Sequence, residues 1–181
     1  MGTKSKTYLI EFNKLKFGHN EFSFLLDDKF LADFEYSPYD KANIKVDLKL
    51  IKAETLYDLK FEFKGNVSVV CDTCAEDIDL PIEEKFGLLI KLSEVNNFDD
   101  SEIIYIARAE IEFDLKQYLY ESLLLAVPQR KGCEELPEPK PCNVEVLKKL
   151  SHDEKFEDTE TSSEDHENED PRWNKLKDLL N

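Results

Sequence analysis

The sequence predicts an α+β fold: a mostly antiparallel β-sheet or partly open barrel with one main helix, an acidic disordered linker and a short C-terminal amphipathic helix. Apolar residues alternate with polar ones through most of residues 1–110, which is typical of half-buried strands. Residues 114–127 instead carry apolar side chains at helical spacing. Residues 153–170 contain ten acidic side chains and one Lys, too few apolar groups for a core. We therefore expect a β-rich domain over 1–152, a linker over 153–170 and a helix over 171–181.

The strands are predicted from alternation, and strands that follow one another without long helices between them favour antiparallel pairing. The clearest alternation runs from Ile44 to Leu50, where lysines and an aspartate occupy the intervening positions. Further strands are expected around Tyr8–Phe12, Phe22–Leu26, Leu59–Phe63, Val67–Val70, Phe86–Leu92 and Ile103–Ile106. The tripeptide Lys64-Gly65-Asn66 predicts a turn between two of them.

The main helix is predicted over Asp114–Val127. Asp114 and Gln117 resemble a capping box, and Pro128 ends the helix. A short helical segment is expected at 30–34, before Ser37-Pro38, and another at 144–150. A loop with four prolines over 128–141 separates the main helix from the segment at 144–150.

Composition narrows the classes of function that the chain can have. The chain has 181 residues, 24 Lys and Arg, 40 Asp and Glu, and a formal net charge of −16. Its 5 glycines stand apart, so no phosphate-binding glycine-rich loop can be written. No apolar run approaches the roughly 18 residues of a membrane-spanning helix, and Met1–Ile10 lacks the apolar core of a signal peptide. We expect a soluble, cytoplasmic protein that does not contact membranes.

The C-terminus predicts a partner-binding helix. Asp170 suits an N-cap and Pro171 the first helical position, while Trp173, Leu176 and Leu180 form one apolar stripe. A helix this short is marginal alone in water, so the stripe must dock on something. Two hypotheses stay open, a partner protein or the chain's own domain.

The four cysteines are Cys71, Cys74, Cys133 and Cys142. Cys71 and Cys74 have the C-x-x-C spacing that lets two thiolates meet one Zn²⁺, and the later pair would complete a structural zinc site. Eight residues separate the later pair, where two to four are usual. The alternative is four free thiols, some of them buried. A redox role is disfavoured because the neighbouring acids Asp72, Glu76, Asp77 and Asp79 raise a thiol pKa, and no βαβ unit surrounds the motif.

No catalytic arrangement is apparent, so we expect that the protein is not an enzyme. The histidines His19, His152 and His166 have no motif-spaced partners, and neither a nucleophile elbow nor a zinc-protease motif occurs.

The order of motifs resembles the YceD-like family, the large ribosomal RNA subunit accumulation proteins. An apolar strand leads into the C-x-x-C, Ile111-Glu112-Phe113-Asp114-Leu115 leads a helix into Leu123–Pro128, a later cysteine lies in a proline-rich loop, and Asp170–Leu176 resembles the family's ending. The resemblance begins near Val67. Family members often carry Arg immediately before the second cysteine, where this chain has Thr73, so a role of that Arg is missing here or has moved.

The resemblance implies a factor for 23S rRNA accumulation and large ribosomal subunit biogenesis without a known enzymatic step. A net charge of −16 opposes broad contact with phosphates, so we expect indirect or local rRNA contact. The expected partners are basic ribosomal proteins or rRNA-processing factors of the large subunit. Two alternatives stay open: a direct RNA-binding module using Lys4, Lys6, Lys14 and Lys16, or a small zinc-binding structural or interaction protein of unrelated role.

Overall fold

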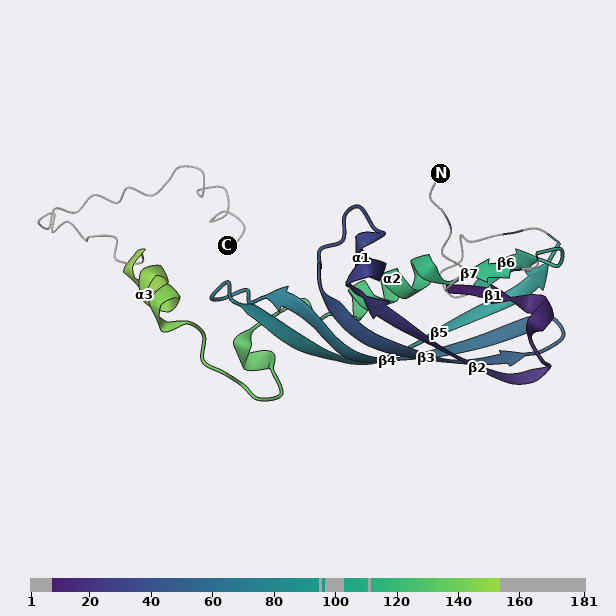
Figure 1. Cartoon of the computed structure of the whole chain (residues 1–181), viewed down its shortest axis with the longest axis horizontal. Helices are drawn as coiled ribbons and strands as arrows, with labels where there is room; N and C mark the ends of the chain where they lie inside the picture. The colour runs from purple at the N-terminus through teal and green to yellow at the C-terminus, as the bar shows by residue number, and fades with distance from the viewer. Residues whose placement is uncertain (1–7, 95, 97–102, 111, 154–181) are drawn as a thin grey trace, which may run out of the picture. The chain divides into compact units, whose positions relative to one another are not determined.

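The computed structural model of the chain describes residues 8–94, 96, 103–110 and 112–153. Its elements are shown in Figure 1, and the α+β class is confirmed. In chain order they are β1 (Leu9–Glu11), the 3-10 turn η2 (Phe12–Lys14), β2 (Gly18–Asp27), α1 (Asp28–Ala32), β3 (Ala42–Lys52), β4 (Leu56–Val70), β5 (Asp77–Ser93), β6 (Ile103–Ala107), β7 (Glu112–Asp114), α2 (Lys116–Ala126), the 3-10 turn η3 (Cys133–Glu135) and α3 (Val144–Asp153).

The main sheet has the strand order β2-β3-β4-β5-β6, and β1 pairs separately with β7. All of these pairs are antiparallel except β5 with β6, which run parallel. Alternation predicted both strands but not their relative direction. Within the described residues the main sheet does not close into a barrel. Of the two predicted alternatives, the mostly antiparallel sheet is the one observed.

Strand β4 is continuous where the sequence predicted a turn. Gly65 lies inside the strand with φ +155°, paired with Ile44 on one side and Ile82 on the other. A Cβ at this position would overlap the carbonyl oxygen of Asn43 and lie 2.7 Å from the Cα of Ile44. Gly65 therefore marks a close approach of two backbones, one of the two roles that an isolated strand glycine has.

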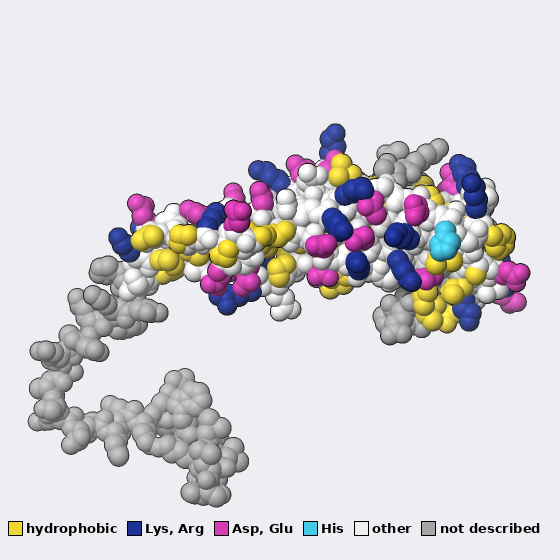
Figure 2. Space-filling view, turned by 90° about the horizontal axis from the view of Figure 1, so that it is seen from below, with side chains coloured by type: hydrophobic (Ala, Val, Ile, Leu, Met, Phe, Trp, Pro, Cys, Tyr) yellow, Lys and Arg dark blue, Asp and Glu magenta, His cyan; other side chains and the backbone are white. Residues whose placement is uncertain are grey.

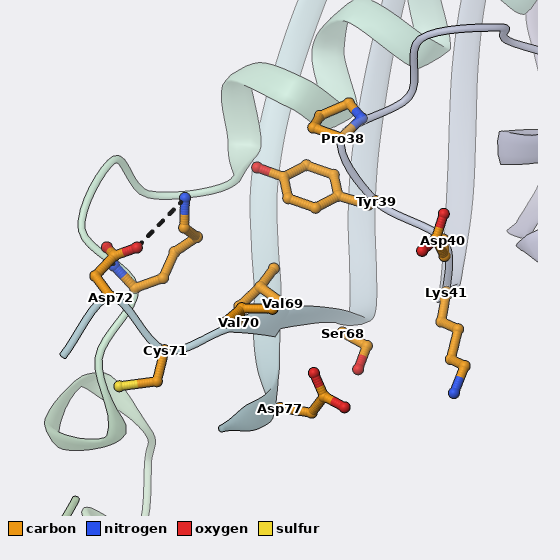
Figure 3. A pocket seen from close by; sticks show the side chains of 11 residues that line it. Pro38, Tyr39, Asp40, Lys41, Ser68, Val69, Val70, Cys71, Asp72 and Asp77 are labelled. Atoms are coloured by element: carbon orange, nitrogen blue, oxygen red, sulfur yellow. Dashed lines mark hydrogen bonds and ion pairs between the residues drawn. The ribbon is translucent and has the colours of Figure 1, made fainter. Parts of the chain in front are cut away.

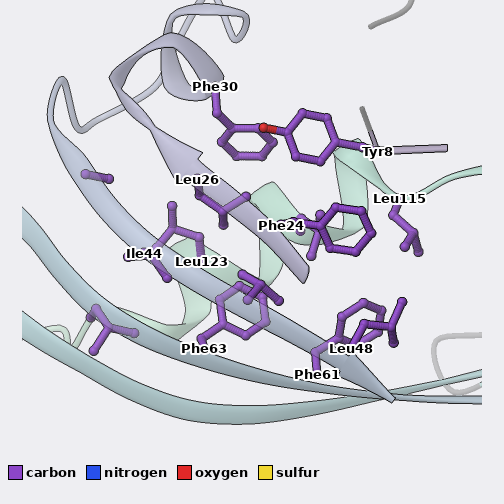
Figure 4. Close-up of a cluster of buried hydrophobic side chains, with 14 of the residues drawn as sticks. Tyr8, Phe24, Leu26, Phe30, Ile44, Leu48, Phe61, Phe63, Leu115 and Leu123 are labelled. Carbon is purple, nitrogen blue, oxygen red and sulfur yellow. The ribbon is translucent and has the colours of Figure 1, made fainter. Parts of the chain in front are cut away.

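The core lies on one face of the main sheet, and α2 covers it (Figures 1 and 4). Leu119, Ser122 and Leu123 of α2 are buried against it. Tyr118 packs on Phe61, with ring centroids 5.0 Å apart, and its hydroxyl donates to the carbonyl oxygen of Gly87 at 2.9 Å. The short helix α1 adds Phe30 and Leu31, which are also buried.

The capping box predicted from Asp114 and Gln117 is wrong, because the N-cap residue makes no side-chain capping hydrogen bond. Asp114 Oδ1 accepts from the backbone N–H of Lys116 at 2.9 Å, while Gln117 donates forward to Glu121 at 2.7 Å. The helix begins at Lys116 because Leu115, not Asp114, occupies the N-cap position.

Contacts group the chain through Leu147 in one compact unit, and from Lys148 on, including the end of α3, residues belong to a second unit. No helix among the described residues is long and apolar enough to cross a membrane. The expected linker over 153–170 and helix over 171–181 lie outside the described residues, apart from Asp153, where α3 ends.

Replacing Gly65 with Ala should lower the free energy of unfolding by about 2 kcal/mol or more, because the added methyl group overlaps the backbone of β3. Gly87→Ala is the matched control, since its Cβ would lie 4.0 Å from the nearest atom, the oxygen of Leu59, and the expected change is within about 0.5 kcal/mol. Urea unfolding measures both. Equal effects of the two substitutions would contradict the close approach at Gly65.

Candidate metal centre

The four cysteines lie together at the end of the sheet where β4 and β5 meet. Their sulfur atoms are all within 4.8 Å of one another. Cys71 Sγ is 3.9 Å from Cys142 Sγ, and Cys74 Sγ is 3.6 Å from Cys133 Sγ. Cys71, Cys74 and Cys133 are buried, and Cys142 is half-buried. The structure thus brings together all four predicted metal-ligating residues.

The separations fit four ligands around one ion. A tetrahedral Zn²⁺ with bonds of about 2.3 Å holds its sulfurs about 3.8 Å apart. Two of the sulfur pairs are 3.6 and 3.9 Å apart, and all pairs lie within 4.8 Å. A disulfide would require about 2.05 Å. Four thiolates are a donor set that selects zinc or iron–sulfur chemistry over hard cations. The residues present therefore fit a structural zinc ion.

The first two cysteines are placed by a tight turn that continues the β4–β5 ladder. The N–H of Cys71 donates to the oxygen of Glu76 at 2.8 Å, and the N–H of Ala75 donates to the oxygen of Cys71 at 2.9 Å. Ala75 has φ +56°, a left-handed conformation uncommon for a residue with a side chain. This turn directs the thiols of Cys71 and Cys74 toward the same side, where the thiols of Cys133 and Cys142 lie.

The second pair is brought together by a fold in the proline-rich segment. Cys133 begins the turn η3, and its carbonyl oxygen accepts from the N–H of Lys140 at 3.2 Å. That hydrogen bond closes a loop, and Cys142 follows two residues later. The unusual eight-residue spacing is thereby compatible with a single site.

Three further hydrogen bonds join the two cysteine segments. The N–H of Asp72 donates to the oxygen of Lys131, and the N–H of Lys131 donates back to Asp72 Oδ2, both at 2.7 Å. Asn143 Nδ2 donates to Glu76 Oε1 at 2.8 Å. The sequence pointed to Asp72 and Glu76 only as acidic neighbours and did not indicate that they join the two segments, because polar residues within two positions of a cysteine are too common to single out.

The thiols differ in their electrostatics. Hydrogen bonds from the backbone N–H of Cys74, and then of Thr73 and Cys133, lower the pKa of Cys71 to about 6 against the opposing effect of burial. Burial, followed by hydrogen bonds that the Cys133 thiol donates to the neighbouring sulfurs, raises the pKa of Cys133 to about 12. Burial also raises the pKa of Cys142.

The expectation that acidic neighbours raise the thiol pKa is wrong for Cys71. The carboxylates of Asp72 and Glu76 turn toward Lys131 and Asn143, and backbone N–H groups face the sulfur instead. The other argument against a thioredoxin-like role is unchanged, since no parallel βαβ unit surrounds this turn.

A cavity of about 450 Å³ lies beside the cysteines at the edge of β4 (Figure 3). Val70, which is 53% exposed, and Tyr39 line it together with Asp72 and Lys131. Burial, followed by the charge of Asp72, raises the pKa of Tyr39. The sequence analysis did not identify this cavity.

The outer face of the sheet carries intermixed lysines and carboxylates (Figure 2). Lys45 lies 2.8 Å from Asp47, and Lys64 lies 2.9 Å from Glu62. Lys60 and Lys85 also have carboxylates within 4.0 Å. Of the lysines that the RNA-binding alternative requires, Lys14 pairs with Glu11 at 2.8 Å, Lys16 is exposed, and Lys4 and Lys6 lie outside the described residues.

The predicted partner-binding residues Trp173, Leu176 and Leu180, and also His166, fall outside the described residues. His19 is exposed on β2, and it is not among the residues gathered at the metal centre.

Fold and site together define a class: a β-rich domain whose C-terminal segment is joined to its main sheet by a four-cysteine centre. Residues 59–180 match the family model described as large ribosomal RNA subunit accumulation protein YceD. The chain therefore belongs to the YceD family, as the order of its motifs predicted. Neither the curated proteins nor the solved structures contain a match to this chain.

Replacing Asp72 with Ala should lower the free energy of unfolding by about 1 kcal/mol, because the Lys131 N–H loses its acceptor. Asp77→Ala is the control, an exposed carboxylate of like charge that also lines the cavity and has no side-chain hydrogen bond to a described residue. Thermal unfolding of both variants measures the change. An equal loss of unfolding free energy in Asp77→Ala would show that the lost charge, not the lost hydrogen bond, is responsible.

Proposed function

We propose that this chain is a non-enzymatic cytoplasmic factor for 23S rRNA accumulation and large ribosomal subunit biogenesis, acting by contact with proteins. The observation that carries the proposal is the family match over residues 59–180, which includes the whole cysteine centre and the helix that packs on the sheet. The family's description names an accumulation role for ribosomal RNA and no reaction.

The metal centre supports a structural role. Four thiolates fill the tetrahedral shell of zinc, whereas catalytic zinc keeps one position open for water or substrate. Among the described residues, these cysteines are also the one group of metal-ligating side chains that gathers closely. We propose Cys71, Cys74, Cys133 and Cys142 as ligands of a structural Zn²⁺ that holds the proline-rich segment on the sheet.

Charge supports protein contact over RNA contact. Recognition through phosphates requires clustered, unpaired Lys and Arg, and this chain has a net charge of −16. On the outer face of the sheet, Lys45, Lys60, Lys64 and Lys85 already lie within 4.0 Å of carboxylates. The proposed partners are basic ribosomal proteins or rRNA-processing factors of the large subunit, with rRNA contact indirect or local.

The proposed organisation is a β-rich domain over 1–152, an acidic linker over 153–170 and a partner-binding helix over 171–181. Trp173, Leu176 and Leu180 supply the apolar stripe of that helix. Ten acidic residues in the linker would attract a basic partner and leave the stripe to bind it.

Purified protein should hold about one zinc ion per chain, and Cys74→Ser should lose both the ion and several degrees of thermal stability, because the structural metal contributes to folding. Thr73→Ser, a substitution at the neighbouring exposed position, should retain both. Elemental analysis and thermal unfolding provide the two readouts. Protein prepared without chelator that contains no metal would end the zinc proposal.

Affinity purification at low salt should enrich precursor proteins of the large subunit, and fewer should remain at high salt, because charge contributes to the contact. Trp173→Ala should reduce that enrichment, since the central aromatic of an interface carries much of its affinity. Asn174→Ala, a substitution outside the apolar stripe of the proposed helix, should not reduce it. Mass spectrometry quantifies the recovered proteins.

Two results would contradict this proposal. One is enrichment of metabolic enzymes alone. The other is tight, sequence-selective binding of the purified protein to an rRNA fragment at physiological salt, where a chain of this charge should bind RNA no better than non-specifically.

A further inference from the structure

The edge of β4 has a gap at Val70. The last pairing of β4 with β3 joins Val67 to Ala42, so the strand runs on without a β3 partner. The N–H of Ser68 donates to the oxygen of Lys41 at 3.0 Å, and the N–H of Asp72 donates to the oxygen of Lys131 at 2.7 Å. Val70 lies midway between these two bonds.

The backbone of Val70 faces this gap. Residues two apart in a strand direct their N–H and C=O groups to the same side, so Val70 follows Ser68 and Asp72 and points away from β5. Cys71, the next residue, points the other way and donates to Glu76 of the returning chain. Among the described residues, none hydrogen-bonds the N–H or C=O of Val70 on the side of the gap.

The gap opens into the cavity of Figure 3, which has room for a backbone and side chains. Tyr39 and the exposed Val70 side chain supply apolar surface. Lys41 and Lys131, whose carbonyl oxygens already accept backbone hydrogen bonds, flank the gap, so an added segment would pair with β4 at Val70 and leave the edge of the sheet on either side.

We propose that this gap binds an extended, basic segment of a partner protein, which adds to β4 as a short strand. An unpaired strand edge is a template for another strand, and main-chain hydrogen bonds supply the affinity in such complexes. An apolar residue of the added segment would pack on Val70 and Tyr39. The proposal rests on the proposed function, since it gives the basic partner a second place to bind.

Charge selects a basic segment. Asp40, Asp72 and Asp77 line the cavity against Lys41 and Lys131, and Lys131 Nζ already lies 3.9 Å from Asp72 Oδ1. The chain as a whole carries −16, so long-range attraction also favours a cationic ligand. The acidic residues 153–170 of the same chain would be repelled.

The test uses the full-length, ¹⁵N-labelled protein and a capped eight-residue peptide of alternating Lys and Val. Adding the peptide should slow hydrogen exchange of the Val70 amide and shift signals of residues 38–41, 68–72 and 131. An otherwise identical Glu and Val peptide, and the Lys and Val peptide methylated on every backbone nitrogen, should each bind about tenfold more weakly or worse.

Val70→Pro removes the free N–H and leaves the β4–β5 ladder unaltered, because that N–H faces away from β5. It should weaken peptide binding by about tenfold. The control is Glu83→Pro on β5. The backbone nitrogen of Glu83 faces away from β4, as does that of the native Pro81 two residues earlier, so a proline at position 83 should likewise be tolerated. Binding should there stay within about twofold of the unmodified protein.

Equal binding to Val70→Pro and the unmodified protein would overturn the proposal and assign peptide binding to charge alone. Undiminished binding of the N-methylated peptide would do the same without depending on how any variant folds. A Val70 amide already protected in the free protein would show that the chain fills its own gap. None of these outcomes alters the zinc content or the enrichment of large-subunit proteins, so the proposed function fails or stands separately.

Discussion

The continuous strand β4 is the constraint on which the other features depend. It pairs with β3 over Ala42–Lys52 and with β5 along its whole length, so both long neighbours take their register from it. This continuity requires glycine at position 65, where the backbone of β3 approaches too closely for a Cβ. Because β4 does not turn there, it carries the chain past the end of β3 to Cys71.

The same extension produces two adjoining features. Past the end of β3, the chain turns through Cys71 and Cys74 and meets the proline-rich segment, which supplies Cys133 and Cys142. Beside this turn, Val70 lies at an edge of β4 that has no neighbouring strand among the described residues, between the backbone hydrogen bonds to Lys41 and Lys131. Lys131 belongs to the segment that carries Cys133 and Cys142, so the candidate metal centre and the proposed strand-binding gap lie on the same segment.

Much of the fold was predictable from the sequence because its signals are local. Alternation identified the long strands, and the helical spacing after Asp114 identified α2. The prediction of a turn at Gly65 was wrong because a lone glycine has the same local sequence pattern in a turn and in a close approach of two backbones. The parallel direction of β6 depends on the path of the chain between Ser93 and Ile103, which local periodicity does not encode.

The cysteine centre was predictable only in part. The spacing of Cys71 and Cys74 indicated that the two thiolates bind one metal ion. The fit of Cys133 and Cys142 depends on a hydrogen bond between the Lys140 N–H and the Cys133 carbonyl oxygen. The low pKa of Cys71 likewise arises from backbone N–H groups, which have no counterpart in side-chain composition. Thiol electrostatics at such a turn therefore follow backbone geometry more than nearby charge.

Four cysteines from two distant segments are proposed to hold one structural zinc ion. X-ray absorption at the zinc edge of the purified full-length protein measures this directly. A shell of four sulfur ligands at about 2.3 Å is expected. A shell containing nitrogen or oxygen, or fewer than four sulfurs, would contradict it.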